Sequence, residues 1–223
     1  MRTVTRAALI DLDGTLLDTA PDLAAAANAT LRELGMAPVA PEAVRDFVGQ
    51  GLAVLMRRCL AASLGGEPEE ALFDDARTRF AGHYERHNGT ASRPFPGVLE
   101  GLRAMRAGGL RLCCATNKPL RFTEPLLART GLRQYFEAVA TSDLAGARKP
   151  DPAVFLYGCR ALGATPAETW VIGDSDNDGA AARAAGCRFL LVPYGYREGR
   201  ALDELQRDAL AATLLEAAGL MAA

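Results

Sequence analysis

The chain has 223 residues, 49% of them apolar and 23% charged, with a formal net charge of −2. This composition is typical of a globular protein with one core domain and room for a smaller inserted domain. The 25 basic and 27 acidic residues are nearly balanced, and no block of Lys and Arg occurs, so we expect neither a nucleic-acid partner nor a membrane surface.

The chain ends and the cysteines predict a cytoplasmic protein. Charged residues interrupt the N-terminal apolar stretch too early for a signal peptide. The apolar tail over residues 209–223 is too short to span a bilayer and contains Glu216, which favours a packed terminal helix. The five cysteines are an odd number without a Cys-x-x-Cys pair, so we expect reduced thiols that serve as small apolar side chains.

The first predicted element is a short buried strand with the sequence AALI over residues 7–10. A helical block follows it, because residues 20–90 contain amphipathic stretches with no convincing strand between them. These stretches cover residues 21–35, 41–49, 51–65 and 67–89. The first strand is therefore separated from the rest of any sheet by helices alone.

From about residue 97 onward, predicted strands and helices alternate. The strands are nearly continuous apolar runs over residues 110–116, 138–142, 170–173 and 188–193, as expected for strands covered on both faces. The helices end at glycine and cover residues 98–109, 119–131, 151–163 and 178–186. This alternation predicts an α/β fold with an open parallel sheet, in which residues 1–18 and 92–223 form the core domain and residues 19–91 an inserted helical domain.

Two carboxylates follow the first predicted strand, in the stretch LIDLDGTLLDT. Asp11 and Asp13 are two residues apart, so their side chains point to the same side of an extended chain. Ligands of open parallel sheets bind at the carboxyl ends of the strands, which is where this pair lies. One carboxylate of such a pair can act as a nucleophile and the other as a general acid and base, and both can hold Mg²⁺.

The other predicted strands end in matching polar groups. Thr116 and Asn117 lie at the end of one strand, Lys149 comes shortly after another, and Asp174 and Asp178 follow a third. Small donors and a lysine can hold phosphoryl oxygens, while a metal ion offsets the repulsion between a phosphate and an attacking carboxylate. The sequence therefore predicts a site for a phosphate dianion beside Mg²⁺ at this edge of the sheet.

These residues resemble four motifs of the haloacid-dehalogenase-like phosphohydrolases, in the order found in that family. DLDGT resembles the first motif, ATN the second, RKP the third and GDSDND the fourth. The resemblance covers nearly the whole chain, and four motifs at strand ends form a far more specific signal than one. It implies a Rossmann-like parallel-sheet core with an inserted all-helical C1-type cap domain.

The resemblance also implies roles for individual residues. Asp11 would be the nucleophile that forms an aspartyl-phosphate, and Asp13 would protonate the leaving alcohol and then activate water. Mg²⁺ would be held by Asp11, the backbone carbonyl of Asp13 and Asp174, with Asp178 as a ligand or as an acceptor for metal-bound water. The phosphoryl group would be bound by the motif residues Gly14, Thr15, Thr116, Asn117 and Lys149, with Lys149 also close to the nucleophile.

Within the family, the segments TAPDLAAA, VGQGLAVLMRR, TNKPLRFTEPLL and VPYGYREG most resemble the bacterial phosphoglycolate phosphatases. This implies hydrolysis of 2-phosphoglycolate, a small phosphorylated metabolite, by a monomer or homodimer. A substrate carboxylate needs a cation, and arginine offers a bidentate fork. Of Arg57 and Arg58 in the predicted cap, the resemblance favours Arg58, although both fit a solvated helix face as well.

Several other polar residues receive a structural interpretation. Asp176 and Arg148 fit solvated positions, and Lys118 is expected to face solvent. The pair His83 and His87 has the spacing of a metal pair but the surroundings of an exposed helix. Tyr194 and Tyr196 fit packing better than a place at the site entrance.

Three alternatives to 2-phosphoglycolate hydrolysis stay open. The same chemistry could act on a sugar phosphate such as N-acetylmuramic acid 6-phosphate, because phosphatases for that compound share the TNKPLRFTEP segment. A phosphomutase and a non-catalytic phosphate-binding relative are less favoured, the latter because all four motifs are intact. In each catalytic case we expect the cap to close over substrate, with hinges near residues 14–20 and 88–96.

Overall fold

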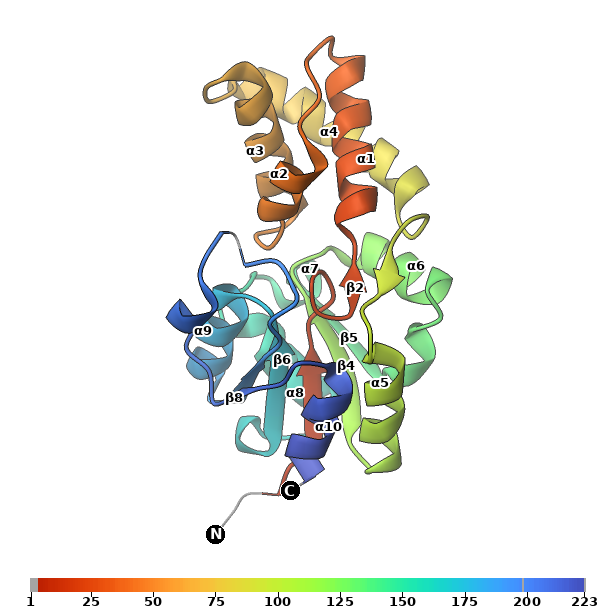
Figure 1. Cartoon of the computed structure of the whole chain (residues 1–223), viewed down its shortest axis with the longest axis vertical. Helices are drawn as coiled ribbons and strands as arrows, with labels where there is room; N and C mark the ends of the chain where they lie inside the picture. Colours follow the sequence, from red (N-terminus) through yellow and green to blue (C-terminus); the bar gives the residue numbers. More distant parts are fainter. Residues whose placement is uncertain (1–3, 198, 223) are drawn as a thin grey trace.

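A computed structural model describes residues 4–197 and 199–222, and within them six parallel strands form a single sheet (Figure 1). The spatial order is β5–β4–β1–β6–β7–β8, which places the first strand in the middle. The strands are β1 (Ala7–Ile10), β4 (Arg111–Thr116), β5 (Ala138–Thr141), β6 (Thr169–Gly173), β7 (Arg188–Leu191) and β8 (Ala209–Leu210).

The sheet is covered by helices on both faces, which explains its continuous apolar strands. On one face, Ala8 and Ile10 of β1 pack in a core with α5 (Val98–Ala107), α6 (Leu120–Arg129) and α10 (Leu214–Ala222). On the other face, Ala7 and Leu9 pack against α8 (Ala153–Ala161) and α9 (Asp176–Ala185). The short helix α7 (Ser142–Ala145) directly follows β5.

The register of the sheet aligns the ends of its three central strands. Ile10, the last residue of β1, lies beside Cys114 of β4 and Ile172 of β6. The residues that leave these strands therefore emerge at one edge of the sheet, as the argument from the motifs requires.

The helical block lies on the carboxyl-end side of the sheet, above the core in Figure 1. It consists of α1 (Ala20–Glu33), α2 (Pro41–Asp46), α3 (Leu52–Leu64) and α4 (Glu70–His87), and α1 packs against the other members of the block. Its apolar core includes Phe80 and Tyr84 of α4, and it meets Phe122 and Tyr196 of the sheet-containing part. An apolar core of its own in the helical block agrees with the predicted division into core and cap, whose boundaries at residues 18/19 and 91/92 stay a prediction.

Two strands pair where the chain enters and leaves the helical block. The two-residue strand β2 (Leu17–Asp18) pairs antiparallel with β3 (Arg93–Pro94), which fastens the two connections to each other. Beside them, Asp22 of α1 is fully buried and accepts hydrogen bonds from the backbone of Gly89, Ala91 and Ser92. Burial alone would raise the pKa of Asp22, but these and further hydrogen bonds hold it below its usual value, so the carboxylate is charged.

The predicted strands and helices are present, with ends shifted by a few residues. The predicted terminal helix is shorter than residues 209–223, because Ala209–Leu210 extends the sheet as β8 and α10 begins only at Leu214. All five cysteines are buried and free of disulfides, as expected. Residues 1–3, 198 and 223 of the predicted core lie outside the described residues. In the described part of the chain, none of the helices combines the length and apolarity that a membrane crossing needs.

Candidate active site

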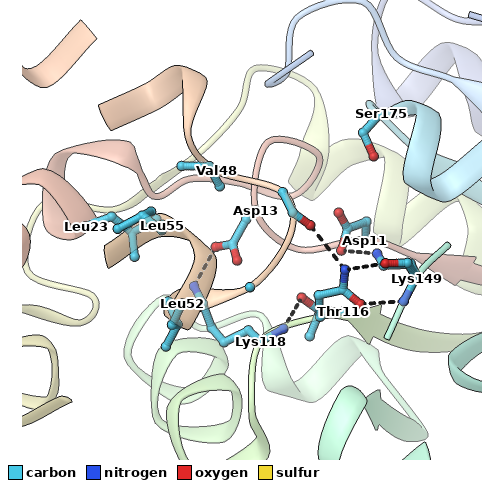
Figure 2. Close-up of a pocket in the computed structure, with 13 residues that line it drawn as sticks. Asp11, Asp13, Leu23, Val48, Leu52, Leu55, Thr116, Lys118, Lys149 and Ser175 are labelled. Atoms are coloured by element: carbon cyan, nitrogen blue, oxygen red, sulfur yellow. Dashed lines mark hydrogen bonds and ion pairs between the residues drawn. The ribbon is translucent and has the colours of Figure 1, made fainter. Parts of the chain in front are cut away.

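The strand ends carry the predicted residues to one place. Asp11 follows β1 directly, Thr116 is the last residue of β4, and Asp174 follows β6. Lys149 reaches the same edge from the loop between α7 and α8, and Asp178 from the first turn of α9. Figure 2 shows Asp11, Thr116 and Lys149 facing a common space.

The first cluster consists of three buried aspartates and one lysine. Asp11, Asp174 and Asp178 each offer a carboxylate oxygen within 4.8 Å of the others. Lys149 lies between two of them: its Nζ is 2.8 Å from Asp11 Oδ1 and donates to Asp178 Oδ1 at 2.8 Å. We call these four residues the nucleophile cluster.

Hydrogen bonds from neighbouring groups hold Asp174 and Asp178 in place. Asp174 accepts hydrogen bonds from the Thr15 hydroxyl and from the backbone N–H of Tyr196, both at 2.6 Å. Asp178 accepts from the hydroxyl of Ser175 at 2.6 Å and closes a capping box at the start of α9. Asp178 therefore both caps the N-terminus of α9 and accepts a hydrogen bond from Lys149.

The packing around Gly14 leaves no room for a side chain. Its φ is +88°, and a Cβ there would lie 2.4 Å from Asp174 Oδ2. Its N–H donates to the carbonyl of Leu17 at 2.9 Å. Gly195, which the sequence did not single out, is equally tight, with a Cβ position 2.3 Å from Asp174 Cβ. That Gly14 and Thr15 also bind phosphate stays a prediction.

The nucleophile cluster has three carboxyl groups and a single ammonium group. Burial raises the pKa of Asp11 to about 7: the loss of hydration and the nearby Asp178 and Asp13 outweigh the opposing effect of Lys149. The pKa of Asp174 is raised well above its usual value, first by burial and then by Asp178 and Asp11. Three close carboxylate oxygens opposed by a single ammonium are the kind of donor set that a hard divalent cation fits.

The second cluster surrounds Asp13 and corrects one expectation. Lys118 was expected to face solvent, but its side chain is fully buried. Its Nζ lies 2.5 Å from Asp13 Oδ1 and donates to the Tyr84 hydroxyl at 2.8 Å. The Thr19 hydroxyl donates to the same Asp13 oxygen at 2.6 Å. We call Asp13, Lys118, Tyr84 and Thr19 the leaving-group cluster, because Asp13 is the predicted acid for the leaving alcohol.

Lys118 keeps its charge in this buried position. Burial alone would lower its pKa, but Asp13 and Tyr84 raise it above the usual value. The sequence contains one signal for this placement: Lys118 comes two residues after Thr116, the last residue of β4. Asp11 and Asp13 have the same two-residue spacing.

Asn117 connects the third motif to the helical block. Its amide donates to the carbonyl oxygens of Lys149 and Gly49, both at 3.1 Å, and its Oδ1 accepts from the Lys149 N–H at 2.7 Å. A phosphoryl contact by this amide would require exchange of the Gly49 carbonyl, so that role stays a prediction. The bond to Gly49 brings the loop before α3 to the edge of the sheet.

Both clusters border the same cavity. The sheet side of the cavity is polar and includes Asp11, Asp13, Lys118 and Lys149. The side formed by the helical block is apolar, with Leu23, Val48, Leu52 and Leu55 as its side chains, several of which are visible in Figure 2. Gly49 and Gly51 form the loop that reaches toward the site.

The other singled-out residues are placed as follows. Arg57 pairs with Glu70 at 2.9 Å, and Arg58 donates to the carbonyl of Phe47 at 3.3 Å; neither is among the described residues that line the cavity. That Arg58 reads a substrate carboxylate stays a prediction. Asp176 pairs with Arg200 at 2.5 Å, and Arg148 is exposed.

His83 and the two tyrosines have structural partners. His83 pairs with Glu33 at 2.7 Å, and among the described residues the possible metal-binding group is the aspartate set rather than the histidines. The Tyr194 hydroxyl donates to the carbonyl of Thr15 at 2.9 Å. The Tyr196 hydroxyl donates to Asp18 at 2.5 Å and accepts from the N–H of Thr19 at 2.7 Å.

Comparison with known families identifies the family of this chain. A family model described as a haloacid dehalogenase-like hydrolase matches residues 5–186. The chain belongs to the haloacid dehalogenase-like hydrolases. This agrees with the motif order, the parallel sheet and the helical insert after β1.

Curated relatives cover almost the full chain. A phosphoglycolate phosphatase from Thiobacillus denitrificans is 48% identical over 96% of this chain and 94% of that protein. One from Nitrosospira multiformis is 46% identical over 97% and 95%. Among solved structures, a predicted phosphoglycolate phosphatase from Haemophilus somnus matches with a TM-score of 0.89 and 28% identity, over 97% of both chains.

Proposed function

We propose that this haloacid dehalogenase-like hydrolase is a Mg²⁺-dependent phosphomonoesterase that converts 2-phosphoglycolate and water to glycolate and phosphate. The observation that carries the proposal is the arrangement around Asp11. The buried Asp11 carboxylate lies close to Lys149 and two further aspartates, and Asp13 lines the same cavity. This arrangement provides both a nucleophile and an acid–base group.

In the first step, an Asp11 carboxylate oxygen attacks phosphorus and the bond between phosphorus and the glycolate oxygen breaks. The electron pair of that bond stays on the glycolate oxygen, which takes a proton from the Asp13 carboxyl. The product of this step is an aspartyl-phosphate on Asp11 with glycolate in the cavity. Lys149, 2.8 Å from Asp11 Oδ1, orients the nucleophile and offsets charge on the phosphoryl oxygens.

In the second step, Asp13 takes a proton from a water molecule whose oxygen attacks the phosphorus of the aspartyl-phosphate. The bond between phosphorus and Asp11 breaks, which releases phosphate and restores both carboxyl groups to their starting states. Thr19 and Lys118 hold Asp13 in place through one of its oxygens, which leaves the other for the proton transfers.

The metal proposed for this site is Mg²⁺, held by Asp11, Asp174, Asp178 and the backbone carbonyl of Asp13. The fit rests on three buried carboxylate oxygens within 4.8 Å of one another and on the raised pKa values of Asp11 and Asp174. A bound divalent cation would neutralise excess negative charge and reduce the repulsion between Asp11 and a phosphate dianion.

The proposed substrate rests on the relatives and on the cavity. The curated relatives named above are phosphoglycolate phosphatases of nearly the same length. The apolar wall of Leu23, Val48, Leu52 and Leu55 offers no hydrogen bonds from its side chains to sugar hydroxyls, which disfavours N-acetylmuramic acid 6-phosphate and hexose phosphates.

Phosphate release with Mg²⁺ from a substrate panel tests this proposal. The panel contains 2-phosphoglycolate, 3-phosphoglycerate, hexose 6-phosphates and N-acetylmuramic acid 6-phosphate. We expect kcat/KM for 2-phosphoglycolate to lead by about 100-fold, equivalent to about 2.7 kcal/mol of transition-state discrimination. A leading sugar phosphate would overturn the substrate and keep the phosphatase, and no release from any ester would overturn both.

A further inference from the structure

We propose that Lys118 is the residue that recognises the carboxylate of the substrate, an inference that rests on the proposed function. Among the described residues that line the cavity, the cationic side chains are Lys118 and Lys149. Lys149 is held between Asp11 and Asp178 and serves the phosphoryl side. Lys118 is the cation on the side of the leaving group.

The covalent structure of the substrate places its carboxylate beside Asp13. In 2-phosphoglycolate, one CH₂ group separates the ester oxygen from the carboxylate carbon. With bonds of about 1.5 Å, a carboxylate oxygen lies roughly 3 Å from the ester oxygen. Asp13 must contact that ester oxygen to protonate it, so the group that binds the carboxylate must be a direct neighbour of Asp13. Lys118 Nζ, 2.5 Å from Asp13 Oδ1, meets this requirement.

Lys118 also has the capacity for a further acceptor. An ammonium group has three N–H donors, and Asp13 and the Tyr84 hydroxyl occupy two of them. The side chain is fully buried, so a carboxylate bound there would form its contact away from bulk water, where a charge-assisted hydrogen bond is strong. Tyr84 belongs to α4, so the helical block takes part in positioning this cation.

The rival residue Arg58 is less well placed in this structure. Its guanidinium donates to the carbonyl of Phe47, and it is not among the described residues that line the cavity. The cavity wall on its side is formed by leucines and a valine, which would not hold a carboxylate. The geometry therefore favours a core lysine over a cap arginine.

The test compares two substrates of nearly equal size in the full-length protein with Mg²⁺. One is 2-phosphoglycolate, and the other is 2-hydroxyethyl phosphate, in which a CH₂OH group replaces the carboxylate. The measured quantity is the ratio of their kcat/KM values. Any effect of Lys118 on catalysis through Asp13 acts on both substrates and cancels in this ratio. Glycolate inhibition of 2-hydroxyethyl phosphate hydrolysis provides a second readout of carboxylate binding.

We expect Lys118→Met to lower the ratio by about 10- to 100-fold and to weaken glycolate inhibition by a similar factor, as expected for a lost charge-assisted hydrogen bond. Lys118→Gln, which keeps a polar group beside Asp13, serves as the second variant should Lys118→Met fail to fold. Arg58→Met tests the rival assignment, and this inference predicts that it keeps the ratio of the wild type.

The outcomes separate this inference from the proposed function. A wild type that shows no preference for 2-phosphoglycolate overturns the proposed substrate. A wild type that prefers it, together with Lys118 variants that keep its ratio, overturns the role of Lys118 alone. Loss of the ratio in Arg58→Met, with the ratio intact in the Lys118 variants, assigns the carboxylate to the cap arginine instead.

Discussion

The nucleophile cluster around Asp11 and the leaving-group cluster around Asp13 differ in their charged groups and in the parts of the chain that supply them. The nucleophile cluster has three aspartates against Lys149, and all four residues belong to the sheet-containing core. The leaving-group cluster pairs Asp13 with Lys118 and draws Tyr84 from α4 of the helical block. Only the first has more carboxyl groups than ammonium groups, which is the kind of donor set that suits a divalent cation.

This difference assigns different tasks to the two sides of the cavity. The core-only cluster can handle a phosphoryl group that is the same in every phosphate ester. In the proposed mechanism, the cluster that spans the core and the helical block faces the part of the substrate that differs between esters. A change in the nucleophile cluster should therefore affect all substrates alike, whereas a change around Lys118 should alter the choice among them.

The largest expected effect comes from the nucleophile itself. Asp11→Asn removes the attacking oxygen, and we expect phosphate release from every ester in the panel to fall by about 10⁴-fold or more. Asp176→Asn is the control, because Asp176 belongs to the same motif set but pairs with Arg200 at the surface. Mg²⁺-dependent turnover by Asp11→Asn within tenfold of the wild type would contradict the assignment.

Asp174→Asn tests the metal side of the comparison. It weakens one proposed ligand, and we expect the Mg²⁺ concentration for half-maximal activity to rise by at least about 10-fold, with equal losses for all substrates. Titration of activity with Mg²⁺ measures this shift. The account would be wrong about the metal site if the Mg²⁺ dependence stayed the same while only substrate preference changed.

The raised pKa of Asp11 also predicts that the stability of the metal-free protein depends on pH. In the unfolded chain Asp11 ionises near pH 4, but burial raises its folded-state pKa to about 7. As pH rises from about 4 through 7, the unfolded state releases its proton first, so the folded state loses stability over this range. In EDTA, Asp11→Asn should therefore have a higher Tm than the wild type at pH 8, and the gap should shrink at pH 5.

We expect a gap of at least about 3 °C at pH 8, which corresponds to about 1 kcal/mol in a chain of this size. Thermal melts at the two pH values with EDTA, and again with Mg²⁺, measure it. Mg²⁺ should close the gap by stabilising the charged wild type. An equal Tm difference at pH 5 and pH 8 would show that ionisation of Asp11 does not destabilise the folded state.

The smallest expected effect probes the leaving-group cluster from the side of the helical block. Tyr84→Phe removes a single hydrogen bond to Lys118, and we expect kcat/KM for 2-phosphoglycolate to fall by about three- to tenfold. The Mg²⁺ dependence should not move, because Tyr84 makes no contact with the nucleophile cluster in the described hydrogen bonds. Tyr157→Phe on α8 is the matched control. A shifted Mg²⁺ dependence would show that the two clusters are not separable.

The core side of the site was predictable from the sequence because its signals are local. Asp11 and Asp174 follow apolar strands and Thr116 ends one, and because parallel strands end at one edge, these positions come together. The helical block was equally clear from its amphipathic stretches. Short elements gave no such signal: β2, β3 and β8 are two residues each and are defined by their partners rather than by their own pattern.

Lys118 shows why the other side was missed. Lysine is rarely buried, so its type argued for solvent. The groups that make burial possible are Asp13, which is 105 positions away, and Tyr84, which is 34 positions away, and neither is visible in local sequence. The tight fit of Gly14 against Asp174 likewise depends on a contact between distant segments.

The most direct test of the central claim is phosphate release from 2-phosphoglycolate, measured with Mg²⁺ and again with excess EDTA. The account predicts turnover that requires Mg²⁺ and a kcat/KM about 100-fold above that for hexose 6-phosphates. Equal turnover of both kinds of ester, or turnover that persists without a divalent cation, would contradict it.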